Sequence, residues 1–448
     1  MARLACVREL VEQRRLLART GADDPRGPHG AACAMVRGVK LDLTVCSEPR
    51  RLLLGLSDGR VDHLHDDLAE GAGDGLDHRY RLSVVDLRDG PDEASFRAEV
   101  RAWLNDNLPA DDNREWSRKI YDAGYAGLTW PEEYGGKGAP YSHQAIVLEE
   151  FARAGAPQHM GVIGLGMAGP TIMAHGSEEQ KRRYLKKILS AEEIWCQGFS
   201  EPGAGSDLSA VGTRIEVTDS HFNVTGQKVW SSFAHIADHC ILVGRSDPDS
   251  ESHAGLTYLI VDMKSPGVEV RPLRQITGEA EFNEIFLTDV KVPRGNLLGE
   301  IGGGWQVAMT TLLHERGTLG FALSGVLESQ VQKLVALVKE RGADDPIIRD
   351  RVAQEWIEMQ ALKFTNYRSL TALMKTGIPG PEGSGAKLHW SEQNQRLTKL
   401  AMEILEGEDD GYWRHQQLRS RGNTIEAGTS EILRNIIAER VLGLPRSR

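Results

Sequence analysis

Apolar positions recur at helical spacing over residues 92–190. The segment DEASFRAEVRAWLNDNLP places its apolar side chains three or four positions apart, at Phe96, Val100, Trp103 and Leu104. That period predicts a helix that stops before Pro109. Ser177 and Gln180 form a capping box ahead of EEQKRRYLKKIL, which predicts a second helix start. We therefore expect this part of the chain to be helical.

The pattern changes over residues 195–300, where short β-branched segments are separated by turn residues. These segments read GTRIEVT, HFNVTGQKVW, HCILVGRS, LTYLIVDM, GVEVRPL and NEIFLTDVKVP. Many short strands at such spacing predict an all-β domain. Helical patterns return with GGGWQVAMTTLLHERGTLGFALSGVLESQVQKLVALVKE and continue to the end of the chain.

Residues 1–90 have a different composition. They contain thirteen arginines, one lysine and a single aromatic residue, Tyr80. A segment with so few large apolar side chains cannot bury enough surface to offset its conformational entropy. We expect these residues to be a leader that is disordered, or one translated upstream of the true start.

Composition excludes several classes of function. A net charge of −11 argues against nucleic acid as the main partner. No stretch approaches the ~18 consecutive apolar residues of a membrane span. The five cysteines show no CxxC or Cys/His spacing, so the sequence predicts no metal site and no disulfide framework. Cytoplasmic localisation fits this cysteine usage best.

Two glycine-rich segments invite a ligand-binding interpretation. Residues 164–169, GLGMAG, fit the dinucleotide pattern GxGxxG, but Pro170 and a charged helix follow where a second strand is required, so close helix packing is favoured. Residues 200–207, SEPGAGSD, offer backbone N–H groups and hydroxyls that suit a phosphate-bearing ligand. A tight surface turn is the alternative for the second segment.

Several motifs, taken in their order along the chain, resemble those of one known family. WPEEYGG, WCQGFSEPGAGSDLSAVGTR, GQKVWSS, NEIFLTDVKVP, NLLGEIGGGW and TIEAGTSEILRNIIAERVLGLPR together resemble the acyl-CoA dehydrogenase family, from about residue 92 to residue 446. The resemblance implies a multidomain α+β fold behind the 1–90 leader. Its parts are an N-terminal helical domain (91–193), a middle β-barrel (194–303) and a C-terminal four-helix bundle (304–448).

The resemblance also implies FAD, held between the barrel and the last bundle. The residues it assigns to the flavin are Gln197, Phe199, Ser200, Trp230, Ser232, Thr429 and Glu431. It assigns Ser206 to the thioester arm of an acyl-CoA substrate. The implied reaction is α,β-dehydrogenation of the thioester to a trans-2-enoyl-CoA, as in fatty-acid or sterol side-chain β-oxidation. It needs a carboxylate base close to the α carbon.

Two glutamates compete for that role. Many family members place the base directly before the last Gly-Thr, but Ala427 stands there in this chain and Glu426 comes one residue early. A second family pattern uses a Glu-Arg pair on the first helix of the bundle, which corresponds to Glu315 and Arg316. The helix face around Glu315 carries no other charge; it consists of Ala308, Thr311, Leu312, Thr318, Leu319 and Ala322. We expect Glu315 to be the base and Arg316 to fix the CoA arm or the base.

The chain departs from the family pattern at two places. Residues 341–354 lack the Arg-x-x-Phe-Gly stretch that reaches a neighbouring subunit's FAD, and residues 404–410 are acidic where a Gly-rich stretch is expected. The resemblance implies a homo- or heterotetramer that passes electrons to an electron-transfer flavoprotein, and these departures favour a mixed oligomer. Two alternatives stay open: a non-catalytic or FAD-sharing subunit, and a flavin oxidase or monooxygenase.

Overall fold

The computed structural model divides the chain into two units, Met1–Val85 and Asp86–Arg448. It describes residues 89–446 apart from 111, 344, 378–379 and 409. In the first unit it describes two antiparallel strands, β1 (Cys33–Val36) and β2 (Val39–Asp42). The expectation of a disordered or mis-started leader at 1–90 otherwise lies outside the described residues.

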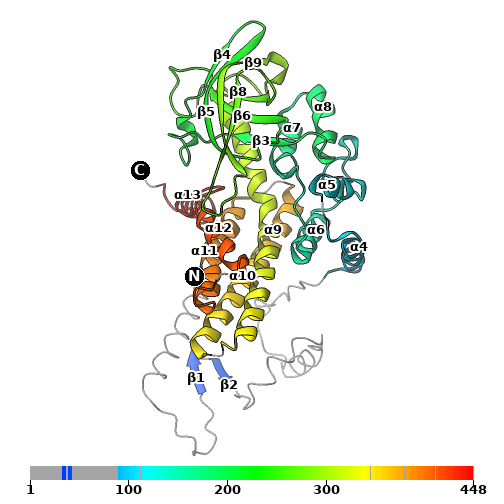
Figure 1. Ribbon diagram of the computed structural model, residues 1–448, viewed down its shortest axis with the longest axis vertical. Coiled ribbons are helices and arrows are strands. Elements are labelled where there is room, and N and C mark those ends of the chain that lie inside the picture. Colours follow the sequence, from blue (N-terminus) through cyan, green and yellow to red (C-terminus); the bar gives the residue numbers. More distant parts are fainter. Residues whose placement is uncertain are drawn as a thin grey trace, which may run out of the picture. The chain divides into compact units, whose positions relative to one another are not determined.

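The N-terminal domain is helical, as predicted (Figure 1). Its elements are α4 (Pro91–Asn107), α5 (Asn113–Asp122), η1 (Glu132–Tyr134), α6 (Tyr141–Ala154), η2 (Gly164–Ala168), α7 (Gly169–His175) and α8 (Glu178–Leu189). Val100 and Leu104 of α4 are buried, which confirms the predicted apolar face. The capping box of α8 is also confirmed: Gln180 N–H donates to Ser177 Oγ over 3.2 Å, and Ser177 N–H donates to Gln180 Oε1 over 2.8 Å.

The GLGMAG segment is a site of close packing. Its first five residues form the π-helix η2, which runs directly into α7. A Cβ atom at Gly169 would lie 2.0 Å from the Trp130 ring, and one at Gly164 would lie 2.8 Å from Ile188. The glycines therefore let neighbouring elements approach, and the dinucleotide interpretation does not apply.

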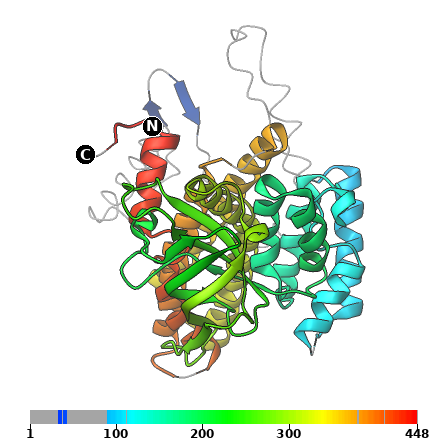
Figure 2. The same ribbon diagram turned by 90° about the horizontal axis from the view of Figure 1, so that it is seen from above.

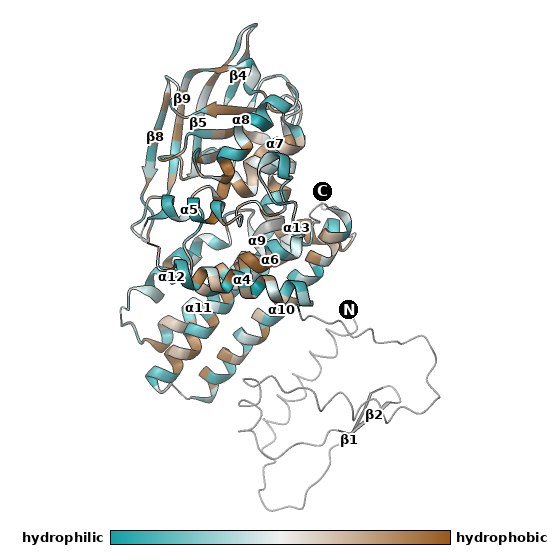
Figure 3. Ribbon diagram, turned by 90° about the vertical axis from the view of Figure 1, so that its right-hand side faces the viewer, coloured by the Kyte–Doolittle hydropathy of each residue, from teal (hydrophilic) through white to brown (hydrophobic). Residues whose placement is uncertain are grey.

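The middle domain is a curled sheet. Its strands are β3 (Trp195–Gly198), β4 (Arg214–Val217), β5 (His221–Ser232), β6 (His239–Arg245), β7 (Leu256–Asp262), β8 (Val268–Leu273) and β9 (Phe282–Pro293). All the predicted strand segments form strands. Buried and exposed residues alternate along β9, whose ribbon changes between hydrophobic and hydrophilic colours (Figure 3). Pairing runs from β7 through β6 to the short β3 and β4, and then through β5 and β9 to β8.

The expected closed β-barrel is wrong, because the sheet is a half-barrel. In the described chain β7 and β8 are its two edges and do not pair with each other. The edge strand β7 is instead covered by helices: Tyr258 and Ile260 share an apolar core with Val307 and Ala308. Leu259 points into a second core on the opposite side of the strand. Helix packing thus takes the place of the strands that would close a barrel.

The C-terminal domain is helical. It contains α9 (Gly304–Arg341), α10 (Pro346–Thr376), α11 (Gly383–Ile404), α12 (Tyr412–Asn423) and α13 (Ser430–Ile436). By length and composition α9 is apolar enough to cross a membrane. Leu327, Val331 and Leu334 of α9 are fully buried among apolar residues of α10 and α11, as in the core helix of a helical domain. Viewed from above, the N-terminal helices and α13 lie on different sides of the sheet (Figure 2).

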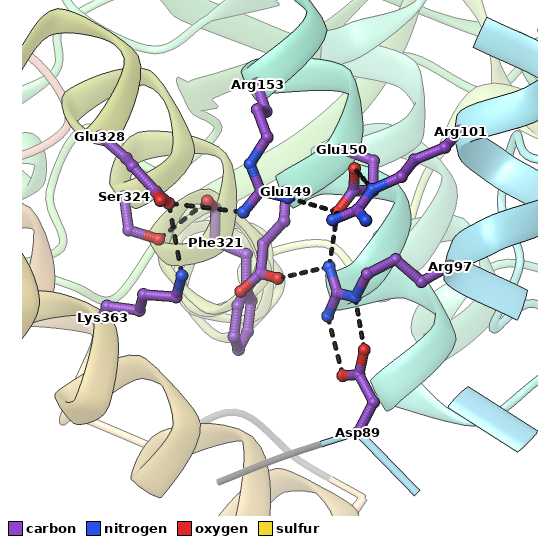
Figure 4. Close-up of polar contacts among 10 residues, drawn as sticks. All are labelled: Asp89, Arg97, Arg101, Glu149, Glu150, Arg153, Phe321, Ser324, Glu328 and Lys363. Carbon is purple, nitrogen blue, oxygen red and sulfur yellow. Dashed lines mark hydrogen bonds and ion pairs between the residues drawn. The ribbon is translucent and has the colours of Figure 1, made fainter. Parts of the chain in front are cut away.

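A network of ion pairs joins the two helical domains (Figure 4). Glu150 of α6 accepts hydrogen bonds from Arg97, Arg101 and Arg153, at 2.6–3.0 Å. Arg153 also lies 3.6 Å from Glu328 of α9. Burial alone would raise the pKa of Glu150, but the guanidinium groups lower it overall. Its charge is therefore kept where α6 packs against the bundle.

Candidate functional site

The SEPGAGSD loop is anchored by a buried ion pair. Lys228 of β5 is fully buried, and its Nζ donates to Glu201 Oε1 over 2.7 Å and to the Phe199 carbonyl over 3.0 Å. Glu201 also accepts from the N–H groups of Gly212 and Thr213, at 2.7 and 2.9 Å. Burial raises the pKa of Glu201, but the charge and hydrogen bond of Lys228, together with the hydrogen bonds from Thr213 and Gly212, lower it overall. The base of the loop is thus fixed to β5.

The tip of this loop is open to solvent. Gly203, Gly205 and Ser206 are exposed, and a Cβ atom added at either glycine would meet nothing within 4 Å. Among the described residues, the N–H groups of these three residues find no acceptor. Several free donors on one exposed loop suit an anionic or phosphate-bearing ligand.

Trp230, near the end of β5, has an unusual backbone conformation. The register between β5 and β9 shifts between Lys228 and Ser231, which places Trp230 in a bulge. Its φ is +60°, a conformation that costs free energy for a bulky side chain, and the residue is 59% exposed. A strained, exposed aromatic side chain is a candidate ligand-facing group. Val229 N–H donates to the Ser200 carbonyl over 2.9 Å, so this face adjoins the SEPGAGSD loop.

The other residues expected to line the flavin are placed as follows. Phe199 is buried and meets Tyr258 edge-on at 5.8 Å, so its ring belongs to the core while its carbonyl holds Lys228. Gln197 of β3 is half-buried, and so is Ser232, which pairs with Phe282 at the end of β5.

The turn before α13 is held by a buried lysine. Lys387 of α11 donates to the carbonyls of Asn423 and Gly428 over 2.6 and 2.9 Å. Ala427 and Gly428 both have positive φ, at +52° and +95°. Thr429 caps α13, with its Oγ accepting from Ile432 N–H, while Glu431 is exposed in the first turn of that helix.

Glu426 is engaged by other side chains. Both of its oxygens accept from the guanidinium of Arg419, at 3.1 and 2.9 Å, and Oε1 also accepts from Asn423 over 2.8 Å. A carboxylate held by a bidentate arginine and an amide has most of its lone pairs in use. The contacts of Glu426 with Arg419 and Asn423 therefore indicate a structural role for its carboxylate.

The Trp230 segment and the 423–428 turn meet through α12. The Trp230 ring lies edge-on to Phe282, with centroids 6.1 Å apart. The guanidinium carbon of Arg419, on α12, lies 5.7 Å from the centre of the Phe282 ring. Segments about 200 positions apart in the sequence therefore flank one region.

Glu315 lies on α9, one turn after a buried hydroxyl network. Thr311 Oγ1 is 2.9 Å from Thr171 Oγ1 of α7 and 3.0 Å from the Tyr258 hydroxyl of β7. Glu315 itself is half-buried. Ala308 and Thr311, on the predicted apolar face, are fully buried. The side chains of residues 316–319, including the expected substrate ligand Arg316, lie outside the described part.

The sequence analysis missed the residues that anchor these segments. Lys228 lies on the same face of β5 as the buried Phe222 and Val224, so the strand alternation places a lysine inward and signals a buried partner. Lys387 lies on α11 at a position whose burial follows only from the packing of α12 and α13. No local signal in the sequence identifies Asn423 as the partner of Lys387, or Arg419 as the partner of Glu426.

Family models match three consecutive parts of the chain. They are described as the acyl-CoA dehydrogenase N-terminal domain (residues 90–192), middle domain (196–290) and C-terminal domain (302–442). The chain belongs to the acyl-CoA dehydrogenase family. It is thus an enzyme of a flavoprotein oxidoreductase family.

Relatives within the acyl-CoA dehydrogenase family give the same result. Acyl-CoA dehydrogenase IpdE1 of Mycolicibacterium smegmatis is 42% identical over 389 residues, covering 78% of this chain and 97% of that protein. FadE34 of Mycobacterium tuberculosis is 37% identical over 365 residues, covering 81% of this chain and 49% of that protein.

Two solved structures are similar in fold. The Tcur3481–Tcur3483 steroid ACAD superimposes with a TM-score of 0.74 at 30% identity, covering 81% of this chain and 100% of that chain. The ChsE4–ChsE5 complex from Mycobacterium tuberculosis gives 0.67 at 27% identity, with coverages of 81% and 100%.

The residues present fit a flavin. Its ring system needs a flat apolar wall and fixed polar donors. The exposed indole of Trp230 is such a wall. The free N–H groups belong to the SEPGAGSD loop, whose first residue, Ser200, accepts a hydrogen bond from Val229, next to Trp230.

Proposed function

We propose that this chain is an FAD-dependent dehydrogenase that converts an acyl-CoA thioester to its trans-2-enoyl-CoA. The observation that carries the proposal is the exposed, strained Trp230 beside the SEPGAGSD loop, in a chain of the acyl-CoA dehydrogenase family. When bound, FAD supplies the acceptor for the hydride from the β carbon. Trp230, Ser200, Ser232 and the segment starting at Thr429 would hold it, together with Gln197, Phe199 and Glu431.

Glu315 is the proposed base that takes the α proton. It lies on a helix whose register against α7 and β7 is fixed one turn earlier by Thr311, Thr171 and Tyr258. A base must reach its proton within hydrogen-bond distance, so a fixed helix register favours this role. Arg316 is proposed to hold the CoA arm, and Ser206 to contact it from the exposed tip of the loop.

Glu426 is the less suitable base. Its two oxygens already bind Arg419, and Asn423 adds a third contact. Protonating Glu426 during turnover would break charge-assisted hydrogen bonds that are about twice as strong as neutral ones. Glu426 lies one residue before the usual family position of the base, and its carboxylate has a structural role in binding Arg419 and Asn423.

The proposed substrate is a bulky CoA thioester of the steroid class, and the proposed assembly is a mixed tetramer. The 30% identity to a steroid ACAD supports the first. The mixed tetramer is proposed from the two segments that depart from the family pattern, residues 341–354 and 404–410. These segments contact each other, since the Arg341 guanidinium lies 2.6 Å from the Glu408 carboxylate. An acidic loop already paired with an arginine is poorly suited to a neighbour's pyrophosphate.

Purified full-length protein tests the proposal. We expect a visible flavin spectrum and anaerobic bleaching by a steroid-type CoA thioester, with transfer to an electron-transfer flavoprotein. If the chain alone is colourless but becomes coloured when co-purified with a homologous subunit, the FAD-sharing alternative holds. Flavin without bleaching by straight-chain, branched or steroid thioesters would contradict the dehydrogenase proposal. Hydrogen peroxide release in place of transfer would indicate the oxidase alternative.

A further inference from the structure

We propose that Arg419 is a positioning residue that fixes the turn before α13 against the Trp230 face. The inference rests on the proposed function, because it assigns these two segments to opposite parts of one flavin site. No motif of the sequence points to Arg419. Its role follows from contacts with two segments that are far apart in the chain.

On one side, Arg419 holds the turn. Its guanidinium nitrogens donate to both oxygens of Glu426, at 2.9 and 3.1 Å. Glu426 passes the constraint to Asn423, whose carbonyl also accepts from Lys387 and Ser391. The turn is therefore tied to α11 and to α12 at the same time.

On the other side, Arg419 contacts the sheet. Its guanidinium carbon lies 5.7 Å from the centre of the Phe282 ring, and its Nε lies 4.0 Å from Glu281. Phe282 meets Trp230 edge-on at 6.1 Å. On the same α12 helix, His415 lies 3.0 Å from Glu279, so the helix is docked on β9 and the loop before it at two points.

The charge of Arg419 is required for both contacts. Burial alone would lower the pKa of Arg419, but its hydrogen bonds and charge interaction with Glu426 raise it overall. A planar guanidinium can bind a carboxylate with two parallel hydrogen bonds and lie over an aromatic ring, which an ammonium group does less well. Lysine should therefore replace Arg419 only in part.

Two readouts on the full-length chain test this role. The first is the dissociation constant of FAD, followed by quenching of flavin fluorescence. Arg419→Gln should weaken FAD binding about tenfold, within the range of a lost charge-assisted pair. The FAD affinity of Arg419→Lys should fall between those of the parent and of Arg419→Gln. Arg351→Gln, which breaks an exposed pair with Glu403 between α10 and α11, is the matched control and should bind FAD as the parent does.

The second readout does not need the cofactor. Trp230 is followed by its ¹⁹F resonance in apoprotein labelled with 5-fluorotryptophan, assigned with Trp230→Phe. Arg419→Gln should shift or broaden this resonance, and Arg351→Gln should leave it in place. An unmoved Trp230 resonance in folded Arg419→Gln would overturn the inference. If the resonance moves but the parent binds no FAD, the coupling stands and the proposed flavin function fails.

A charge exchange separates positioning from general destabilisation. Arg419→Glu combined with Glu426→Arg should recover part of the FAD affinity that either single change loses. Thermal unfolding of each variant shows whether it is folded at the assay temperature. Recovery supports a specific pair, whereas losses that simply add would contradict it.

Discussion

Lys228 Nζ lies 2.7 Å from Glu201 Oε1, and this pair joins the interior of β5 to the base of the SEPGAGSD loop. The lysine side chain has no exposure, and the pKa of Lys228 is lowered by burial despite the opposing charge of Glu201. A buried lysine in a sheet needs a charged partner, so the glutamate of the loop is required for structure.

Removing one member of this pair should be costly. We expect Glu201→Gln to lower the free energy of unfolding by about 3 kcal/mol, because it leaves Lys228 buried without its counter-charge. Urea denaturation measures the change. Glu216→Gln is the matched control in the same domain: its contact with Arg214, at 3.9 Å, is exposed, so the change should stay within about 0.5 kcal/mol. Equal losses in the two variants would contradict the account.

Acid should weaken the packing of α4 against α6, because the arginine partners of Glu150 all lie on these two helices. The folded-state pKa of Glu150 is lowered overall, so its stabilising contribution is present above the unfolded value of about 4.3 and is lost as pH falls through the folded pKa. Glu150→Gln should therefore flatten the acid side of the stability curve, measured by urea unfolding between pH 3 and about pH 7. Glu115→Gln, in an exposed pair with Lys119, should leave the curve almost unchanged. A Glu150→Gln curve as steep as the parent's would contradict this prediction.

Trp230 should report directly on occupation of the site. Its indole is exposed in the free protein, so iodide should quench its fluorescence, and bound FAD should protect it. Comparing quenching in the parent and in Trp230→Phe isolates this residue from the other tryptophans. Trp230→Ala should weaken FAD binding by about tenfold to a hundredfold, since it removes a large apolar wall. Unchanged quenching after flavin is bound would place the flavin elsewhere.

The sequence predicts those parts of the fold that depend on local pattern. The apolar spacing around Val100 predicts α4, and the capping box at Ser177 predicts the start of α8. Each strand of the sheet except β3 follows from its own β-branched run. The closed barrel was wrong because closure depends on what covers β7, and Ala308 of α9 reaches that strand from about fifty residues away.

The site residues likewise divide into those that the sequence predicts and those that depend on packing in space. Trp230 and the SEPGAGSD loop are predictable because family motifs include them. Arg419 and Lys387 are not, since their role depends on the distance between α11, α12 and β9 in space. Phe199 is a further case: its motif is readable from the sequence, but the edge-on packing of its ring against Tyr258 in the core is not.

The choice between two glutamates is the central claim, and a single-turnover experiment tests it most directly. Full-length Glu315→Gln and Glu426→Gln are loaded with FAD and mixed anaerobically with an acyl-CoA that bleaches the parent. We predict that Glu315→Gln keeps its flavin but is reduced at least ~10²-fold more slowly, as expected for loss of a general base. Glu426→Gln should retain most of the rate, with weaker FAD binding. A larger loss of rate in Glu426→Gln at saturating FAD would contradict the assignment and make Glu426 the base.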